Sequence, residues 1–182
     1  MIRHSAEKTS LTEKAFLPDG TVYVLKPSGP EAVSMREVLR RGPTVLFALP
    51  GAYTSVCSTK QVPEYATKAE TFRKLGIRQI LCLSVNDPYV MNAWAGGLGV
   101  LPQVITFLSD PDAVYTKAIG MDQHLEGLGV RSLRYSALID RDGFIGILNV
   151  DERGGKTYKV SGPDNMLKLI EAVTKTGQAL PE

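Results

Sequence analysis

Two continuous apolar runs dominate the pattern of hydrophobic and polar positions along the chain. They span Thr44–Leu49 and Gln79–Val85. A short apolar run without alternation is typical of a central strand that is buried on both faces. A third segment, Thr21–Leu25, alternates apolar with polar residues after a turn at residues 18–20, which predicts a strand with one exposed face.

Further strands are predicted at Ile105–Leu108, Arg134–Ile139 and Phe144–Val150. The last two are separated by Asp-Arg-Asp-Gly at residues 140–143, which indicates a tight β-hairpin.

Helical spacing of apolar residues, with capping and terminating residues at the ends, predicts the helices. They lie at Glu31–Arg41, Ser58–Leu75, Asp87–Trp94, in the segment that begins at Asp110-Pro111, and at Asn165–Lys175. Pro63 conflicts with the second of these helices, because an interior proline should kink the helix or confine the proline to a first turn. The tetrapeptide Gly-Leu-Gly-Val occurs at 97–100 and 127–130, and both copies are expected in loops.

Strands and helices alternate along the chain, which predicts an α/β fold with a sheet covered by helices. The hairpin at 140–143 adds antiparallel edge strands to that sheet. No segment is long or biased enough to serve as a linker, so residues 1–182 are expected to form a single domain with a flexible start at 1–10.

Composition and charge narrow the classes of function. The chain is 43% hydrophobic and 22% charged, and its net charge of +2 comes from scattered Lys and Arg, unlike the basic footprint of a nucleic-acid-binding protein. No apolar run approaches the roughly 18 residues that span a bilayer. Two cysteines in 182 residues argue against a secreted disulfide scaffold, so a cytoplasmic location is expected. An organellar location is the alternative if Arg3, His4 and Lys8 belong to a processed transit segment.

Cys57 is the main candidate for chemistry, because it lies where a buried strand ends and a helix begins. Free N–H groups and partial positive charge at a helix N-terminus favour the thiolate, which is the reactive form of cysteine. Cysteine at a strand end is otherwise usually a small buried apolar residue. The other cysteine, Cys82, lies within the predicted strand 79–85, and a fixed disulfide framework is not expected.

The residues around Cys57 resemble the active-site signature of the peroxiredoxins. Pro50, Thr54 and Cys57 form the pattern Pro-x-x-x-Thr-x-x-Cys, and the string at 47–54 is similar to the peroxiredoxin-5, or type II (plant-like), subfamily. Similar blocks follow at 84–94, 107–111, 134–136 and 148–150. The resemblance implies a thioredoxin-like fold, with a mixed central sheet flanked by helices and a peroxiredoxin-type N-terminal extension.

The activity that the resemblance implies is a thiol-dependent peroxidase for hydrogen peroxide, alkyl hydroperoxides and peroxynitrite. Cys57 would attack one peroxide oxygen and become a sulfenic acid, while the other oxygen leaves. The resemblance also assigns Thr54, Arg134 and Pro50 to the site. Thr54 can hydrogen bond one turn before the cysteine, Arg134 supplies permanent charge and several donors, and Pro50 can shield the thiol from water.

Each of these helpers has a simpler interpretation. Thr54 could be an ordinary helix N-cap, Pro50 could only end a strand, and Arg134 could be a surface charge. Arg131 lies three residues before Arg134 and competes with it for the same role. The Arg-Tyr-Ser context at 134–136 favours Arg134.

Gln61 is a departure from the family, whose members commonly have a histidine four residues after the active cysteine. Because glutamine keeps a donor and an acceptor, an altered rate or substrate preference is expected rather than a loss of activity.

Cys82 matches a cysteine of the plant-like members and has two interpretations. It is either a resolving thiol that closes a disulfide with Cys57 or a buried core residue that never reaches it. A disulfide needs Cα atoms within about 7 Å, and a central strand cannot easily move, which favours the second interpretation.

The animal-type resolving cysteine is absent from residues 156–161, so an external reductant is expected. Glutathione with glutaredoxin, or thioredoxin, would reduce Cys57 through a mixed disulfide. The resemblance also implies a homodimer, and it implies no metal or organic cofactor. His4 and His124 with the two cysteines do not have zinc spacing.

A second class of function is a thioredoxin-fold interaction protein or chaperone that uses Cys57 as a redox switch. Such a binding protein needs neither Thr54 nor Arg134, and those residues favour the peroxidase.

Overall fold

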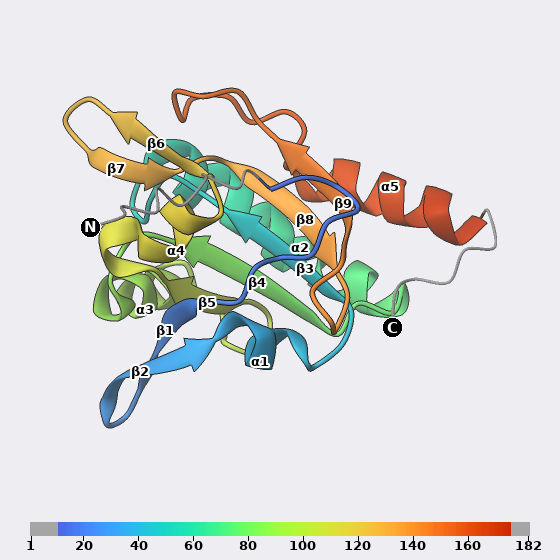
Figure 1. Cartoon of the computed structure of the whole chain (residues 1–182), viewed down its shortest axis with the longest axis horizontal. Helices are drawn as coiled ribbons and strands as arrows, with labels where there is room; N and C mark the ends of the chain where they lie inside the picture. The colour runs from blue at the N-terminus through green and yellow to red at the C-terminus, as the bar shows by residue number, and fades with distance from the viewer. Residues whose placement is uncertain (1–10, 176–182) are drawn as a thin grey trace, which may run out of the picture.

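The computed structural model describes residues 11–175 and shows a mixed sheet between two layers of helices (Figure 1). The strands are β1 (Thr21–Lys26), β2 (Gly29–Ser34), β3 (Thr44–Ala48), β4 (Gln79–Ser84), β5 (Thr106–Ser109), β6 (Asp122–Leu125), β7 (Gly129–Ser132), β8 (Tyr135–Ile139) and β9 (Ile145–Val150). The helices are α1 (Met35–Leu39), α2 (Val62–Lys74), α3 (Pro88–Gly97), α4 (Val114–Ala118) and α5 (Pro163–Lys175). The predicted flexible start at 1–10 lies outside the described residues.

The main sheet has seven strands in the order β2-β1-β5-β4-β3-β8-β9. Its three central strands, β5, β4 and β3, run parallel, and the flanking strands pair antiparallel. The prediction of an α/β sheet with antiparallel edge strands is confirmed. Both predicted apolar runs, at β3 and β4, lie at the centre.

Helices cover both faces of the sheet, which is why the central strands carry no polar face. The core on one face is formed with α2, α3 and α5 and includes Phe47, Cys82 and Leu138 from the strands. The core on the other face is formed with α1 and α4 and includes Leu46, Leu81 and Ala137. Alternate residues of β3, β4 and β8 therefore enter opposite cores.

The predicted helix Glu31–Arg41 is wrong over its first four residues. Residues Gly29–Ser34 form β2, which pairs antiparallel with β1 along its full length. The helix α1 begins only at Met35, where the Ser34 hydroxyl accepts a hydrogen bond from the Glu37 N–H at 3.4 Å. Ser34 ends the strand and caps the helix, and cross-strand pairing outweighed the apparent helical spacing.

The expectation of a loop at 127–130 is also wrong in part. Gly129 begins β7, which pairs with β6 in a separate two-stranded sheet that the sequence pattern did not indicate. Gly127 and Gly129 have φ values of 74° and 75°, which glycine adopts without steric cost, so the glycines close the turn of this hairpin. In the copy at 97–100, Gly97 is the last residue of α3, and only residues 98–100 lie outside a helix or strand.

The predicted helix Ser58–Leu75 is divided at Pro63. A π-helical turn at Cys57–Gln61, called the π-turn below, precedes α2, and Pro63 lies in the first turn of α2. The Val62 N–H donates to the Cys57 carbonyl, five residues back. Pro63 has no N–H to donate to the preceding turn, so it fits where the hydrogen-bonding pattern changes. This outcome is one of the two that the proline predicted.

The helix predicted from Asp110-Pro111 is also interrupted. A short 3₁₀ turn at Pro111–Ala113 precedes α4, and Asp112 and Ala113 have positive φ values of 63° and 56°. The Asp110 carboxylate accepts hydrogen bonds from the N–H groups of Tyr115 and Thr116 at 2.9 and 2.7 Å. Asp110 therefore caps a helix that begins later than the sequence suggests. The Asp87 cap of α3 is as predicted, accepting from Tyr89 and Val90.

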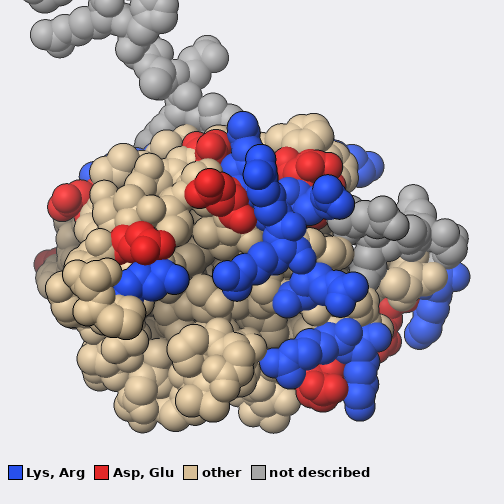
Figure 2. Space-filling view, turned by 90° about the horizontal axis from the view of Figure 1, so that it is seen from below, with Lys and Arg blue, Asp and Glu red and all other residues tan. Residues whose placement is uncertain are grey.

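Lys and Arg side chains gather on the face that carries α1 (Figure 2). Arg36, Arg40 and Arg41 are exposed there, just before β3 begins. This positive face thus lies at the amino end of β3, while Cys57 follows its carboxyl end. Within residues 11–175, no helix is long and apolar enough to cross a membrane.

Candidate active site

The loop between β3 and the π-turn places Cys57 at the carboxyl end of the central strands. Its conformation is fixed by two hydrogen bonds between side chains and backbone: the Ala52 N–H donates to Asn86 Oδ1 at 2.8 Å, and Thr54 Oγ1 donates to the Gly51 carbonyl at 2.8 Å. Tyr53 adopts a positive φ of 61° at the tip of the loop. Cys57 then begins the π-turn with no solvent-exposed surface.

Arg134 is the charged group that meets the Cys57 thiol. Its Nη1 lies 3.3 Å from Cys57 Sγ, and the Arg134 residue is only 2% exposed. A guanidinium held in a site without bulk water stabilises negative charge far more effectively than an exposed one. The arrangement therefore offers a donor to an oxygen that gains negative charge beside the Cys57 sulfur.

Gln61 fixes the position of Arg134 from within the π-turn. Its Oε1 accepts a hydrogen bond from Arg134 Nη1, and its Nε2 donates to the Ala48 carbonyl at 3.4 Å. Gln61 is fully buried. The residue that departs from the family pattern thus bridges the end of β3 and the guanidinium.

A second set of contacts to Arg134 comes from residues 151–161, between β9 and α5, called the clamp loop below. Arg134 Nε donates to the Thr157 carbonyl at 3.1 Å and Nη2 donates to the Gly155 carbonyl at 2.9 Å. The ring of Tyr158 lies 5.8 Å from the guanidinium carbon. Together with the contacts of Nη1 to Gln61 and Cys57, these hydrogen bonds engage all three nitrogens of the Arg134 guanidinium.

Asp151 holds the clamp loop in place. Its carboxylate accepts from the N–H groups of Lys159 and Val160, both at 2.9 Å, and from the Ser161 hydroxyl at 2.6 Å. The Asp151 N–H donates to the Arg134 carbonyl at 2.9 Å. The sequence pattern did not indicate this loop, because backbone carbonyls can come from any residue type. An aspartate directly after a predicted strand was the only signal.

Arg131 does not take the role of Arg134 in this structure. Its Nε donates to the Leu128 carbonyl at 3.0 Å, and its Nη1 lies against Gly51, where a Cβ atom would be 2.9 Å away. Arg131 therefore packs on the loop before Cys57, whereas Arg134 contacts the thiol. The role of Arg134 in the reaction stays a prediction, and the structure brings its side chain, not that of Arg131, to the thiol.

Pro50 and Thr54 lie in the loop that precedes the thiol. Pro50 is buried beside Gly155 of the clamp loop, where a Cβ atom on Gly155 would approach Pro50 Cγ to 3.4 Å. The Thr54 carbonyl accepts from the Ser58 N–H at 3.0 Å, which places Thr54 one turn before the cysteine, as expected. The Thr54 hydroxyl donates to the Gly51 carbonyl within the loop.

Cys82 lies in the middle of β4, between Phe47 of β3 and Phe107 of β5. It has no exposed surface, and burial raises the pKa of its thiol well above the usual value, with the neighbouring Cys57 acting in the same direction. Both cysteines are free thiols. A neutral thiol in the centre of a paired strand is a poor nucleophile, which agrees with the interpretation of Cys82 as a core residue.

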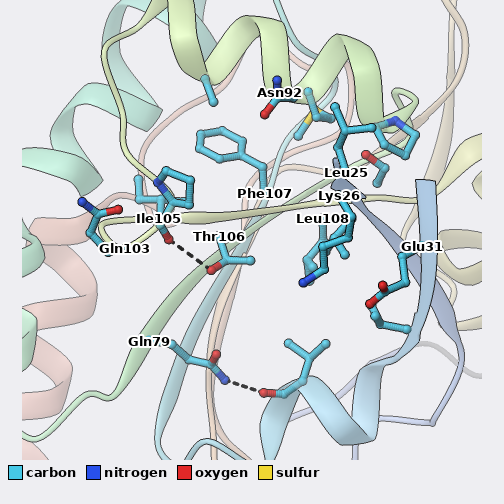
Figure 3. Close-up of a pocket in the computed structure, with 18 of the residues that line it drawn as sticks. Leu25, Lys26, Glu31, Gln79, Asn92, Gln103, Ile105, Thr106, Phe107 and Leu108 are labelled. Carbon is cyan, nitrogen blue, oxygen red and sulfur yellow. Dashed lines mark hydrogen bonds between the residues drawn. The ribbon is translucent and has the colours of Figure 1, made fainter. Parts of the chain in front are cut away.

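No cluster of three or more His, Cys, Asp or Glu suited to a metal ion occurs among residues 11–175. A cavity of about 630 Å³ opens between α3, α1 and the diverging strands β1 and β5, with Phe107, Thr106 and Gln79 on its walls (Figure 3). Its lining includes neither Cys57 nor Arg134, so it lies apart from the candidate active site.

Comparison with known proteins gives consistent matches over most of the chain. The family model described as Redoxin matches residues 12–167. The protein Peroxiredoxin-2E, chloroplastic, of Arabidopsis thaliana is 41% identical over 160 residues, which cover 85% of this chain and 67% of that protein. Peroxiredoxin-2B of Arabidopsis thaliana is 37% identical over 157 residues, which cover 85% of this chain and 94% of that protein.

Solved structures match the fold as well. Reduced Prx3 in complex with H₂O₂ from Vibrio vulnificus superposes with a TM-score of 0.82 at 32% identity, covering 88% of this chain and 99% of that one. Peroxiredoxin 5 from Alvinella pompejana gives a TM-score of 0.75 at 28% identity, covering 89% and 99%. These superpositions confirm the predicted thioredoxin-like α/β fold.

Proposed function

The chain belongs to the peroxiredoxins, in their type II subfamily, and from this premise we propose which peroxides it reduces and what restores its thiol. It is a thiol-dependent peroxidase with an antioxidant role. The alternative of a binding protein with a redox switch has no support in these relatives.

We propose hydrogen peroxide and alkyl hydroperoxides as substrates, with Cys57 as the nucleophile. The Cys57 thiolate attacks one peroxide oxygen, a sulfur–oxygen bond forms, and the oxygen–oxygen bond breaks. The second oxygen leaves as hydroxide or alkoxide and takes up a proton to become water or an alcohol. Cys57 is left as a sulfenic acid, oxidised by two electrons.

The observation that supports this assignment is the 3.3 Å contact between Arg134 Nη1 and Cys57 Sγ in a buried site. The donor lies where negative charge passes from sulfur to the leaving oxygen, so it can stabilise the transition state. Gln61 and the clamp loop hold the guanidinium in place before peroxide binds, so the Arg134 side chain need not reorient during the reaction. Pro50 helps to keep water out, because it is buried between the thiol loop and Gly155.

We propose that an external thiol regenerates the enzyme. A thiolate of glutathione or thioredoxin attacks Cys57 sulfur, the sulfur–oxygen bond breaks, and water leaves. A second thiol, from glutaredoxin or from the second cysteine of thioredoxin, then reduces the mixed disulfide by exchange. Burial of Cys82 within paired strands supports an external route.

Steady-state turnover with each reductant system tests this route. We expect Cys82→Ser to turn over with the effective reductant at the wild-type rate, since Cys82 is not needed for recycling. Mass spectrometry after one equivalent of peroxide should show no disulfide between Cys57 and Cys82 in the wild type. An obligatory disulfide, or loss of turnover in Cys82→Ser with its fold intact, would refute the external route.

Two further features are proposed by analogy with the subfamily. A homodimer through the face near the active site would be detected as a two-fold mass in sedimentation equilibrium, and a monomer at micromolar concentration would contradict it. A reducing compartment such as the cytoplasm suits two free thiols. Imaging of the full chain tagged at its C-terminus tests the location, and an extracellular signal would contradict it.

A further inference from the structure

A cleft lined by three arginines lies on the face of the molecule that carries α1, away from the candidate active site (Figure 2). It has a volume of about 680 Å³, and its lining includes neither Cys57 nor Arg134. Its walls come from residues 16–18, from α1 together with Arg40, and from residues 141–143 in the turn before β9. This arginine cleft, as we call it below, is large enough to enclose a small-molecule ligand.

The arginine cleft is positively charged, and most of that charge is unpaired. Arg36, Arg40 and Arg141 line it and are exposed, and the one carboxylate in the lining is that of Asp142. Within the part of the chain that the structure describes, the side chains of Arg40 and Arg141 make no hydrogen bond or ion pair. Arg36 pairs only with Asp19, whose carboxylate lies 4.0 Å from Arg36 Nε at the surface. An exposed pair at that distance is weak, so all three guanidinium groups remain available to an anion.

The placement of the arginines favours phosphate over other anions. Arg36 and Arg40 are four residues apart, so they project from the same side of the helix and repel each other. A bound anion would remove that repulsion. Guanidinium groups form paired hydrogen bonds with phosphate oxygens. A phosphate group has three terminal oxygens that can accept from several guanidinium groups at once, whereas a carboxylate has two.

An exposed aromatic ring stands at the edge of the same cleft. Phe16 is 64% exposed, although its segment is held in place by the next residue, where the Leu17 N–H donates to the Gly143 carbonyl at 2.7 Å. The Phe16 ring packs edge-on against Phe144, with ring centroids 5.6 Å apart. A ring that is fixed at one edge and largely exposed offers a face to another planar group.

The floor between the charges and the ring is apolar. Leu17, Met35 and Leu39 line it, and all three are buried. Gly143 has a φ of 93°, and a Cβ atom there would lie 3.5 Å from the Leu17 carbonyl, so the turn packs closely on the N-terminal segment. The cleft therefore combines an apolar floor and an aromatic edge with a cationic rim, which suits a ligand with a planar ring at one end and negative charge at the other.

We propose that the arginine cleft binds a nucleotide, with its phosphate groups on Arg36, Arg40 and Arg141 and its base against Phe16. Inorganic phosphate would leave the ring and the apolar floor unused, and a neutral aromatic molecule would leave the arginines unused. The site goes beyond the proposed function, because the cleft lies at the amino end of β3 whereas Cys57 follows its carboxyl end.

Isothermal titration calorimetry of the full chain with ADP at low ionic strength tests the site. Pyrophosphate and adenosine represent the charged half and the planar half of the ligand. Arg40→Gln and Arg141→Gln each remove one guanidinium from the cleft, and Phe16→Ala removes the ring. Arg73→Gln is the matched control, because it removes an exposed arginine of α2 that lies outside the cleft.

We expect ADP to bind more tightly than either pyrophosphate or adenosine. Arg40→Gln and Arg141→Gln should each weaken ADP binding about ten-fold, as is typical for the loss of hydrogen bonds between charged groups. Phe16→Ala should weaken ADP binding about five-fold and leave pyrophosphate binding unchanged, because only the base contacts the ring. Arg73→Gln should match wild type, and added salt should weaken the binding of ADP.

Three results would overturn the proposal. The first is a folded wild-type protein that binds no ADP at about 1 mM, or arginine variants of the cleft that both bind ADP like wild type. The second is equal affinity for ADP and pyrophosphate with no effect of Phe16→Ala, which would make the cleft a site for inorganic anions. The third is tighter binding of a short single-stranded oligonucleotide than of ADP, which would contradict a free nucleotide as the ligand.

Discussion

Arg134 is the residue on which the rate of peroxide reduction should depend most, after the cysteine itself. Its Nη1 contacts Cys57 Sγ, and it is the buried charge at the thiol. We expect Arg134→Met to lower kcat/KM for hydrogen peroxide by about 10²–10³, the loss typical of removing a donor to developing negative charge. Stopped-flow measurement of peroxide consumption provides the value.

Arg131→Met is the control for that variant, because it removes an equal charge that lies against Gly51 and does not contact the thiol. We expect a change of less than about five-fold. A larger loss in Arg131→Met than in Arg134→Met would reverse the assignment of the two arginines.

Gln61 supplies a neutral partner for Arg134, and a charge at this position should alter the pH dependence of the reaction. In Gln61→Glu a carboxylate would pair with the guanidinium and reduce the positive potential at Cys57. We expect about a ten-fold lower rate at pH 7 and a rate profile moved to higher pH.

The histidine variant is the informative comparison for Gln61. In Gln61→His, a protonated imidazole would repel Arg134 at low pH, so we expect a loss of rate as pH falls through about 6.5 that the wild type does not show. Stopped-flow rates between pH 5 and 9 measure both variants. Profiles identical to wild type for both would show that residue 61 does not act through Arg134.

At the scale of elements, the clamp loop should couple stability to activity. Asp151 is 4% exposed, and its carboxylate accepts hydrogen bonds from three donors of the loop that contacts Arg134. We expect Asp151→Ala to lower the free energy of unfolding by about 3 kcal/mol, because the buried Ser161 hydroxyl and two partly buried N–H groups lose their acceptor. We also expect about a ten-fold lower kcat/KM, because Arg134 loses the carbonyls of the loop.

The matched control is Asp164→Ala, which removes an exposed carboxylate that pairs with Lys68 on the surface. We expect a change within about 1 kcal/mol and normal activity. Urea unfolding and steady-state assays measure both variants. Normal activity in Asp151→Ala would show that the clamp loop is not needed to position Arg134.

The elements that the sequence predicted well are those whose signal is local. Two such elements are β3 and β4, which are recognisable from their own apolar runs, and a third is α3, which begins at its Asp87-Pro88 cap. All three lie where expected. β2 and the β6–β7 hairpin are different, because their strands are held by pairing with a partner rather than by a pattern of their own. The π-turn likewise needed the structure, since Pro63 allowed two outcomes.

For the candidate site, the residues of the signature segment could be located from the sequence and the residues that support them could not. Pro50, Thr54 and Cys57 lie close together in the sequence, in the segment that follows β3. Arg134 was found through the resemblance alone. The carbonyls of Gly155 and Thr157 belong to no motif, because a backbone acceptor imposes no side-chain type.

At the scale of the whole molecule, stability should come from the two cores on either side of the sheet. Phe47 is fully buried in β3 and stacks on Tyr65 of α2, with ring centroids 4.1 Å apart. We expect Phe47→Ala to lower the free energy of unfolding by about 3–5 kcal/mol, through lost burial and a residual cavity. Phe16→Ala, at a position 64% exposed, should cost about 1 kcal/mol or less. Equal losses in urea unfolding would contradict this view of the core.

Peroxide consumption by wild type and Cys57→Ser, in the presence of dithiothreitol, tests the central claim most directly. The claim is that the Cys57 thiol is the group that attacks peroxide. We expect the wild type to consume hydrogen peroxide catalytically and the serine variant to fall to the rate of dithiothreitol alone, since a hydroxyl cannot form the sulfenic acid. A folded Cys57→Ser protein that consumes peroxide as fast as wild type would contradict the claim.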